Sequence, residues 1–258
     1  MPTPDPGGPG AGQGAGQGAG QGARPALAVS DLSAGYQGIA VVRELSRTVG
    51  QGEIVALLGP NGAGKPTTLE TIAGLHRPIA GSIELSGRDV TGTPAHVLAR
   101  RGMALVPEGR ALFPGLTVRE HLRLAGGRGG AREQELLAML PELEKCLDRK
   151  AGLLSGGEQQ MLAVGRALVT RPGMLLVDEM SLGLAPVIVE RLLPVLRKVA
   201  DEFGTSVLFV EQHVALALEI ADRAYILTHG RISLEGPAAR LRENRELLAA
   251  SYLGESAA

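Results

Sequence analysis

A glycine-rich segment that ends in a lysine is the first part of the sequence that could do chemistry. It follows an apolar run ending at Leu58, precedes residues that favour a helix, and reads Gly59-Pro60-Asn61-Gly62-Ala63-Gly64-Lys65. Glycines let backbone N–H groups turn inward around an anion, and a helix start adds a favourable dipole. Lys65 can neutralise the β- and γ-phosphates as a point charge. The segment predicts a phosphate-binding loop, and the alternative is a structural glycine-rich turn.

The residue after Lys65 departs from this pattern. A Ser or Thr there would ligate Mg²⁺ through its hydroxyl, whereas this chain has Pro66, followed by Thr67 and Thr68. Proline supplies neither a hydroxyl nor a backbone N–H, and the side chain of Thr67 should point about 100° away on a helix. Proline suits the first turn of a helix. We therefore expect Pro66 to weaken Mg²⁺-dependent chemistry without breaking the fold.

Two adjacent carboxylates follow a short, wholly apolar run at residues 174–177. They are Asp178 and Glu179. Such a run is typical of a strand buried on both faces of a parallel sheet, and ligands bind beyond the carboxyl ends of such strands. Asp178 is placed to hold Mg²⁺ through water, and Glu179 is placed to polarise the attacking water. Because acidic pairs after strands are common, this prediction depends on the phosphate loop upstream.

A third segment, residues 154–160, lies between these two motifs and precedes a helix. The hydroxyl of Ser155 and the N–H groups of Gly156 and Gly157 could donate to a phosphate at the helix start. The alternative is an ordinary helix N-cap with a nearby glutamate, which the same residues would also serve. The position between two nucleotide motifs favours the phosphate role.

Strands and helices alternate along the chain and predict what holds these motifs. Strands are expected at 26–29, 39–42, 53–58, 82–85, 174–177 and 206–210, with a hairpin over 224–234. Helices are expected at 67–73, 157–170, 187–203 and 214–221, and residues 95–153 are expected to be mostly helical. The alternation predicts a parallel α/β sheet, and the short N-terminal strands predict a smaller antiparallel sheet beside it.

The composition restricts the class of protein. The chain has 258 residues, 44% of them hydrophobic, and a net charge of −1, so one large domain is expected and no nucleic-acid partner. The single cysteine, Cys146, excludes an intrachain disulfide and fits a reducing compartment. Neither a membrane span nor a secretory signal is expected. Residues 1–24, with a Gly-Ala-Gly-Gln repeat, are expected to form a disordered tail.

The segment Leu154-Ser155-Gly156-Gly157-Glu158-Gln159-Gln160 resembles the signature sequence of ABC transporter ATPases. The resemblance covers nearly all of residues 26–254. It implies an ABC ATPase domain over 25–254, with a mostly parallel sheet core, a small antiparallel β subdomain and a helical subdomain over about 95–165. It also implies ATP sandwiched between the phosphate loop of one subunit and the signature of another. Tyr36 matches the aromatic residue that stacks on adenine.

A narrower resemblance is to the second ATPase of branched-chain amino-acid importers. The segments that resemble it are 106–110, 112–118, 181–186 and 210–212. The resemblance implies transmembrane permease subunits, a second ATPase subunit and, indirectly, an external solute-binding protein. It also implies a peripheral position on the cytoplasmic face of the inner or plasma membrane.

Several residues depart from the commonest family pattern. Glu108 stands where most ABC ATPases have a glutamine that senses Mg²⁺ and the membrane partner, and Gln212 stands where most have a switch histidine. Gln212 is expected to contact the γ-phosphate or to order Glu179. His213 is one residue late for the switch role, and the alternative is a solvated or packing histidine. Ala185 stands where an acidic residue is usual, and Met180 stands where a proline is usual after the carboxylate pair.

These residues together predict a subunit that binds and hydrolyses ATP to energise the import of branched-chain or other amino acids. Lys65, Glu179 and Gln212 would act on the phosphates and the water. An alternative, favoured by Pro66 and the absent switch histidine, is a regulatory nucleotide-binding subunit of such a transporter with little turnover. A third class, the soluble non-transport ABC proteins, usually carries two cassettes or large insertions, and this chain has neither.

Overall fold

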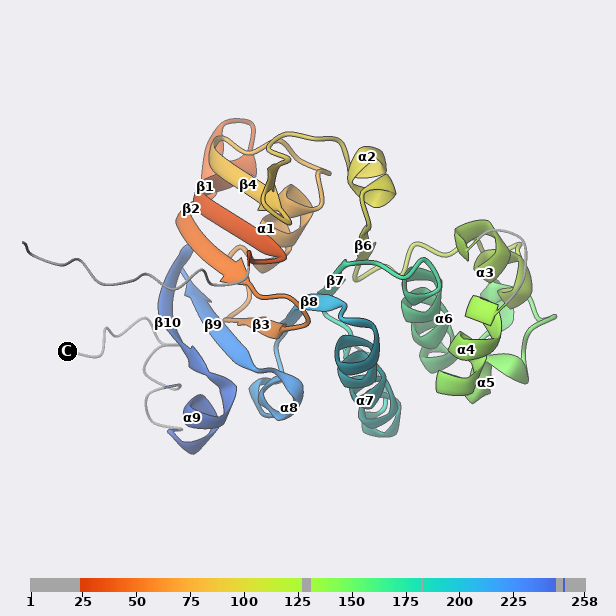
Figure 1. Cartoon of the computed structure of the whole chain (residues 1–258). Coiled ribbons are helices and arrows are strands. Elements are labelled where there is room, and N and C mark those ends of the chain that lie inside the picture. The colour runs from red at the N-terminus through yellow and green to blue at the C-terminus, as the bar shows by residue number, and fades with distance from the viewer. Residues whose placement is uncertain (1–23, 127–130, 182, 245–247, 249–258) are drawn as a thin grey trace, which may run out of the picture.

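The computed structural model in Figure 1 describes residues 24–126, 131–181, 183–244 and 248. The predicted tail, residues 1–24, lies outside this range except for Arg24. Two sheets and a separate group of helices make up the described part of the chain, as the sequence predicts. Within that part, no helix combines the length and the hydrophobicity needed to cross a membrane.

A six-stranded sheet in the order β10-β9-β3-β8-β7-β6 runs through the molecule. Its strands are β3 (Ile54–Leu58), β6 (Met103–Val106), β7 (Met174–Asp178), β8 (Ser206–Glu211), β9 (Arg223–Thr228) and β10 (Arg231–Pro237). Neighbouring strands are parallel except for β9 and β10, which form the predicted hairpin. Leu58 pairs with Glu211 and Asp178 pairs with Val210, so the ends of β3, β8 and β7 meet at one edge.

A smaller antiparallel sheet in the order β2-β1-β4-β5 lies beside the first. Its strands are β1 (Leu27–Tyr36), β2 (Ile39–Val49), β4 (Ala80–Leu85) and β5 (Arg88–Asp89). The turn between β1 and β2 places Tyr36 at the end of β1, opposite Ile39. The predicted antiparallel sheet is therefore confirmed, although β1 and β2 run several residues further than the sequence predicted.

Helices pack against both faces of the larger sheet and also form a group beside it. They are α1 (Lys65–Ile72), α2 (Ala95–Arg100), α3 (Val118–Gly126), α4 (Ala131–Met139), α5 (Pro141–Glu144), α6 (Gly156–Leu168), α7 (Pro186–Phe203), α8 (Val214–Ile220) and α9 (Ala238–Glu243), with a 3₁₀ turn at Ala151–Leu153. Alternate residues of β3 enter different apolar clusters. Ile54 and Ala56 pack with residues of α6 and α7, whereas Val55 and Leu57 pack with α1 and the antiparallel sheet. The motif-bearing edge thus lies between two separate cores.

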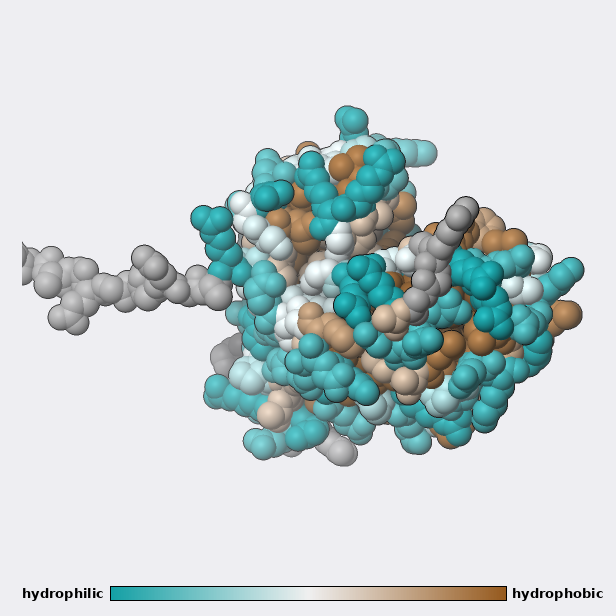
Figure 2. All heavy atoms as spheres, turned by 45° about the vertical axis from the view of Figure 1, so that its right-hand side comes forward, coloured by the Kyte–Doolittle hydropathy of each residue, from teal (hydrophilic) through white to brown (hydrophobic). Residues whose placement is uncertain are grey.

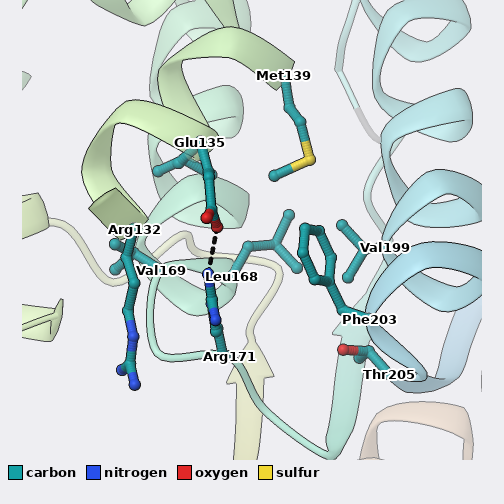
Figure 3. A pocket seen from close by; sticks show the side chains of 10 residues that line it. Arg132, Glu135, Met139, Leu168, Val169, Arg171, Val199, Phe203 and Thr205 are labelled. Carbon is teal, nitrogen blue, oxygen red and sulfur yellow. Dashed lines mark hydrogen bonds and ion pairs between the residues drawn. The ribbon is translucent and has the colours of Figure 1, made fainter. Parts of the chain in front are cut away.

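Helices α3, α4, α5 and α6 gather at one side of the molecule (Figure 1). Figure 3 shows where α4 and the end of α6 meet α7. Arg171, just after α6, forms an ion pair with Glu135 of α4, and its guanidinium carbon lies 5.6 Å from the ring centroid of Phe203. The two contacts tie the helical group to the last turn of α7. On the face seen in Figure 2, hydrophilic residues predominate and hydrophobic residues lie in small groups between them.

The strand β6 was not predicted from the sequence. It lies inside the region that was expected to be mostly helical, and it pairs in parallel with β7 at the edge of the larger sheet. Its four residues form an apolar run too short for periodicity to separate strand from helix. The remaining helices of that region are α2, α3, α4 and α5, so the helical prediction holds elsewhere in it.

Candidate functional site

The predicted phosphate loop joins β3 to α1, as expected. Gly59 and Gly64 adopt φ angles of 152° and 104°. A Cβ atom on Gly59 would lie 2.1 Å from the carbonyl oxygen of Leu227, and one on Gly64 would lie 2.7 Å from a methyl group of Val42. Only glycine fits these positions, because of both the space and the left-handed backbone. The tip of the loop, with Asn61 and Gly62, is exposed, while Ala63 is buried.

The side chain of Lys65 folds back on this loop. Its Nζ donates hydrogen bonds to the carbonyl oxygens of Gly59, at 2.8 Å, and Pro60, at 3.1 Å. Burial lowers the pKa of Lys65, and the charges of Glu179, Asp178 and Glu211 oppose that shift. The ammonium is therefore held by neutral acceptors, for which phosphate oxygens could substitute at the same place.

Pro66 is the second residue of α1, and neither of the threonines after it replaces the missing hydroxyl. The Thr68 hydroxyl donates to the carbonyl oxygen of Gly64 at 2.9 Å, and the Thr67 Oγ1 lies 3.5 Å from the hydroxyl oxygen of Tyr36. Both threonine side chains are buried. The Thr68 hydroxyl is thus engaged by the backbone at the start of α1, and the Thr67 hydroxyl lies near Tyr36.

Asp178 ends β7 in a buried position, with only 6% of its surface exposed. Its Oδ1 is buried and has no hydrogen-bond partner among the residues that the structure describes. Burial raises the pKa of Asp178 to about 7, the charges of Glu179, Glu108 and Glu70 add to the rise, and Lys65 opposes it. A divalent cation beside this oxygen would balance the surrounding negative charge and give the oxygen a partner.

The side chains at this edge could supply only some of the ligands of a Mg²⁺ ion. Within the described residues no group of three or more His, Cys, Asp or Glu side chains could hold a metal ion. Mg²⁺ commonly keeps several waters and binds through one or two carboxylates together with substrate phosphates. Asp178 would be one such carboxylate. Glu108 is exposed in the loop after β6 and lies close enough for its charge to act on Asp178.

Glu179 and Gln212 lie in direct contact. The Nε2 of Gln212 donates to both carboxylate oxygens of Glu179 at 2.8 Å. Glu179 has a φ of 42°, a left-handed conformation that is uncommon for a residue with a side chain. One of the two contacts expected for Gln212 is thus present, and the γ-phosphate contact stays a prediction. His213 is exposed at the start of α8.

Ser155 is the N-cap of α6 and forms a reciprocal capping box with Glu158. The Ser155 Oγ accepts the N–H of Glu158 at 3.3 Å, and the Glu158 carboxylate accepts the N–H of Ser155 at 2.7 Å. The local N-cap interpretation is therefore correct for this chain. Ser155 and Gly156 are nevertheless exposed, as a role toward a neighbouring subunit requires.

Tyr36 is 47% exposed and lies beside α1. Its hydroxyl donates to Glu70 at 3.2 Å, and its ring meets the ring of His76 edge-on, with centroids 5.1 Å apart. Glu70 also lies 3.3 Å from the Nε2 of His76. An exposed ring held by such contacts is available for stacking on a base.

Two residues at the site had no role in the predictions drawn from the sequence. Arg110 donates to the side-chain oxygens of Gln159 and Gln160 at 2.8 and 3.0 Å, and so links the loop after β6 to α6. Glu211 is a buried carboxylate at the end of β8. A charged residue that continues an apolar strand at its carboxyl end was a signal available in the sequence.

Comparison with known proteins gives consistent results. A family model described as ABC transporter matches residues 42–181. The chain is 41% identical to the high-affinity branched-chain amino acid transport ATP-binding protein BraG of Pseudomonas aeruginosa, over 88% of this chain and 99% of the relative. It is 31% identical to the protein BraF of the same description and organism, over 91% of this chain and 100% of the relative.

A solved structure described as the ATP binding subunit of an ABC transporter superposes with a TM-score of 0.77 and 32% identity. The match covers 89% of this chain and 98% of that one. The fold predicted from the sequence is therefore confirmed beyond the segment that the family model matches.

The buried charge of Asp178 gives a test of this geometry. Its pKa is raised in the folded protein, so the nucleotide-free fold binds more protons than the unfolded chain between about pH 4 and 7 and loses stability as pH rises through that range. Asp178→Asn should stabilise the protein, and the gain should grow by about 1–3 kcal/mol from pH 5 to pH 8, since one pKa unit corresponds to about 1.4 kcal/mol.

Thermal unfolding in the presence of a chelator measures this gain at the two pH values. Glu84→Gln, an exposed carboxylate in β4, serves as the control. A gain from Asp178→Asn that is the same at pH 5 and pH 8 would contradict the account.

Proposed function

The chain belongs to the ABC transporter family of ATPases, and we propose that it is one of two ATP-hydrolysing subunits of an amino-acid importer. The observation that supports hydrolysis best is the meeting of Lys65, Asp178 and the Glu179–Gln212 pair at one sheet edge. The proposed substrate class rests on the relatives BraG and BraF, both described as branched-chain amino acid transport proteins.

The proposed nucleotide position follows from the contacts on both sides of the loop. The triphosphate lies along Gly59–Gly64, and Lys65 exchanges the carbonyl oxygens of Gly59 and Pro60 for phosphate oxygens. The adenine stacks on the ring of Tyr36, which is 47% exposed. Thr67, whose hydroxyl lies near that of Tyr36, lines the path between ring and loop.

The proposed chemistry is an attack of water on the γ-phosphate, with no covalent intermediate. Glu179 polarises the water, and Gln212 fixes the orientation of the Glu179 carboxylate through two hydrogen bonds. Mg²⁺, when bound with the nucleotide, would supply neutralising charge at the phosphates. Asp178 and Glu108 are the residues proposed to hold it, Asp178 through its buried Oδ1.

The proposed working unit is a pair of ATPase subunits attached to transmembrane permease subunits. The donors of Ser155, Gly156 and Gly157 would complete the ATP site of a neighbouring subunit. Two different ATP-binding proteins of one organism, BraG and BraF, both resemble this chain, which supports a heterodimer with a sister ATPase. Import would further require an external solute-binding protein, and the ATPase would lie on the cytoplasmic face of the membrane.

A second candidate is a nucleotide-binding subunit with little turnover of its own. Pro66 favours it, because residue 66 has no hydroxyl, the Thr68 hydroxyl donates to the carbonyl oxygen of Gly64, and the Thr67 hydroxyl lies near Tyr36. The intact Glu179–Gln212 pair opposes it. ATPase rates of the subunit alone and of the reconstituted transporter distinguish the two candidates.

Replacement of Glu179 tests the proposed hydrolysis. Glu179→Gln keeps the side-chain shape but removes the charge that polarises water. We expect kcat to fall by at least about 100-fold, the scale of general-base catalysis, while ATP still binds and closed dimers accumulate. Steady-state ATPase assays and size-exclusion chromatography with ATP measure both effects. Hydrolysis by Glu179→Gln at the parent rate would show that the catalytic carboxylate lies elsewhere.

Replacement of Pro66 tests whether the loop is impaired. Serine would restore a hydroxyl and a backbone N–H, and a hydrogen bond to a charged group is worth about 1.5–3 kcal/mol. At about 1.4 kcal/mol per decade, Pro66→Ser should raise the Mg²⁺-dependent ATPase rate at least tenfold. The melting temperature without nucleotide should change little. Equal rates for Pro66→Ser and the parent would indicate that the loop compensates, and would remove the main support for the low-turnover candidate.

A further inference from the structure

Glu211 is a buried carboxylate that the proposed chemistry does not use. It is the last residue of β8, and only 2% of its surface is exposed. Three donors converge on it. Its Oε1 accepts the N–H of Ser181 at 2.9 Å, and its Oε2 accepts the hydroxyl of Ser181 at 2.7 Å and the N–H of Gln212 at 3.2 Å. Burying a charged carboxylate without hydrogen-bond partners costs much free energy, so these three donors are needed to keep Glu211 buried.

The three donors come from the two segments that hold the catalytic pair. Ser181 lies two residues after Glu179, and the side chain of Gln212 donates two hydrogen bonds to Glu179. Between them, the N–H of Glu179 donates to the carbonyl oxygen of Val210 at 3.1 Å. Met180, between Glu179 and Ser181, is fully buried. The left-handed φ of Glu179 is thus fixed on both sides by contacts to the end of β8.

We propose that Glu211 is a positioning residue for ATP hydrolysis, which holds the Ser181 and Gln212 backbones together so that Gln212 presents the Glu179 carboxylate to the attacking water. The inference rests on the proposed function and assigns Glu211 no contact with nucleotide. Glu211 acts on the reaction only through Gln212 and the segment from Glu179 to Ser181.

The chemistry of the network requires a carboxylate rather than its amide. Two of the three donors are backbone N–H groups, one on each oxygen, and neither can reverse its direction. A glutamine at position 211 would place its NH₂ group against one of these N–H groups in either amide orientation. A donor facing a donor must move apart, so Glu211→Gln should open one side of the network while keeping the side-chain volume.

The first experiment compares turnover, nucleotide affinity and structure of Glu211→Gln with those of the parent. Glu219→Gln is the matched control, because Glu219 is exposed on α8, eight residues further along the chain. We expect kcat of Glu211→Gln to fall at least tenfold, with ATP affinity of the folded protein within about threefold of the parent and no change for Glu219→Gln. A crystal structure should show the Gln212–Glu179 hydrogen bonds broken.

Ser181→Ala is a milder variant that is measured beside Glu211→Gln and that tests the proposal by itself if Glu211→Gln does not fold. It removes only the hydroxyl donor and should lower kcat by about threefold, and adding it to Glu211→Gln should lower kcat no further, because both act on one network. A folded Glu211→Gln protein with parental kcat, or one that keeps both Gln212–Glu179 hydrogen bonds, would overturn the proposal. So would an unchanged kcat for Ser181→Ala.

Failure of the proposed function gives a different pattern. A parent and a Glu219→Gln control that bind ATP but hydrolyse none would contradict the hydrolytic role. The inference about Glu211 is then decided by the structural comparison alone, since the contact between Gln212 and Glu179 can be observed without turnover.

Discussion

An excess of buried negative charge at one sheet edge is the constraint on which the rest of the site depends. Asp178 and Glu211 are buried there, Glu179 is half-buried, and the only buried cation among the described residues is Lys65. The consequences are visible in the raised pKa of Asp178 and in the unpartnered oxygen of its side chain. A cation would balance this charge, and the proposed metal–nucleotide complex would bring both that cation and the phosphates for Lys65.

At the same edge, the pairing of the strands determines how the side chains of the site are oriented. Because β7 and β8 are parallel neighbours, Asp178 lies opposite Val210, and the residues after each strand emerge side by side. Glu179 can then meet Gln212 directly. Glu211, at the end of β8, accepts a hydrogen bond from Ser181 and so links the turn after β7 to the end of β8. The residues that we propose to be catalytic are in this way positioned by rigid strand ends rather than by long loops.

The sequence was sufficient for those parts of the site that follow from local pattern. The loop of residues 59–65, the carboxylates at the end of β7 and the helix capped by Ser155 depend on short-range rules, and all lie where the sequence predicted. Strand β6 was missed because a run of four apolar residues is too short to show a strand or helix periodicity. Its pairing with β7 joins segments that are far apart in the sequence. The network around Glu211 was missed for a related reason. Its partner Ser181 is 30 residues away in the chain, so no local pattern links the two.

The most direct test of the account is the structure of the Glu179→Gln protein with ATP and Mg²⁺. The account predicts that the Nζ of Lys65 leaves the carbonyl oxygens of Gly59 and Pro60 for phosphate oxygens, and that the Oδ1 of Asp178 faces the hydrated metal. A nucleotide bound away from Gly59–Gly64, or an Asp178 Oδ1 still without a partner in that complex, would contradict it.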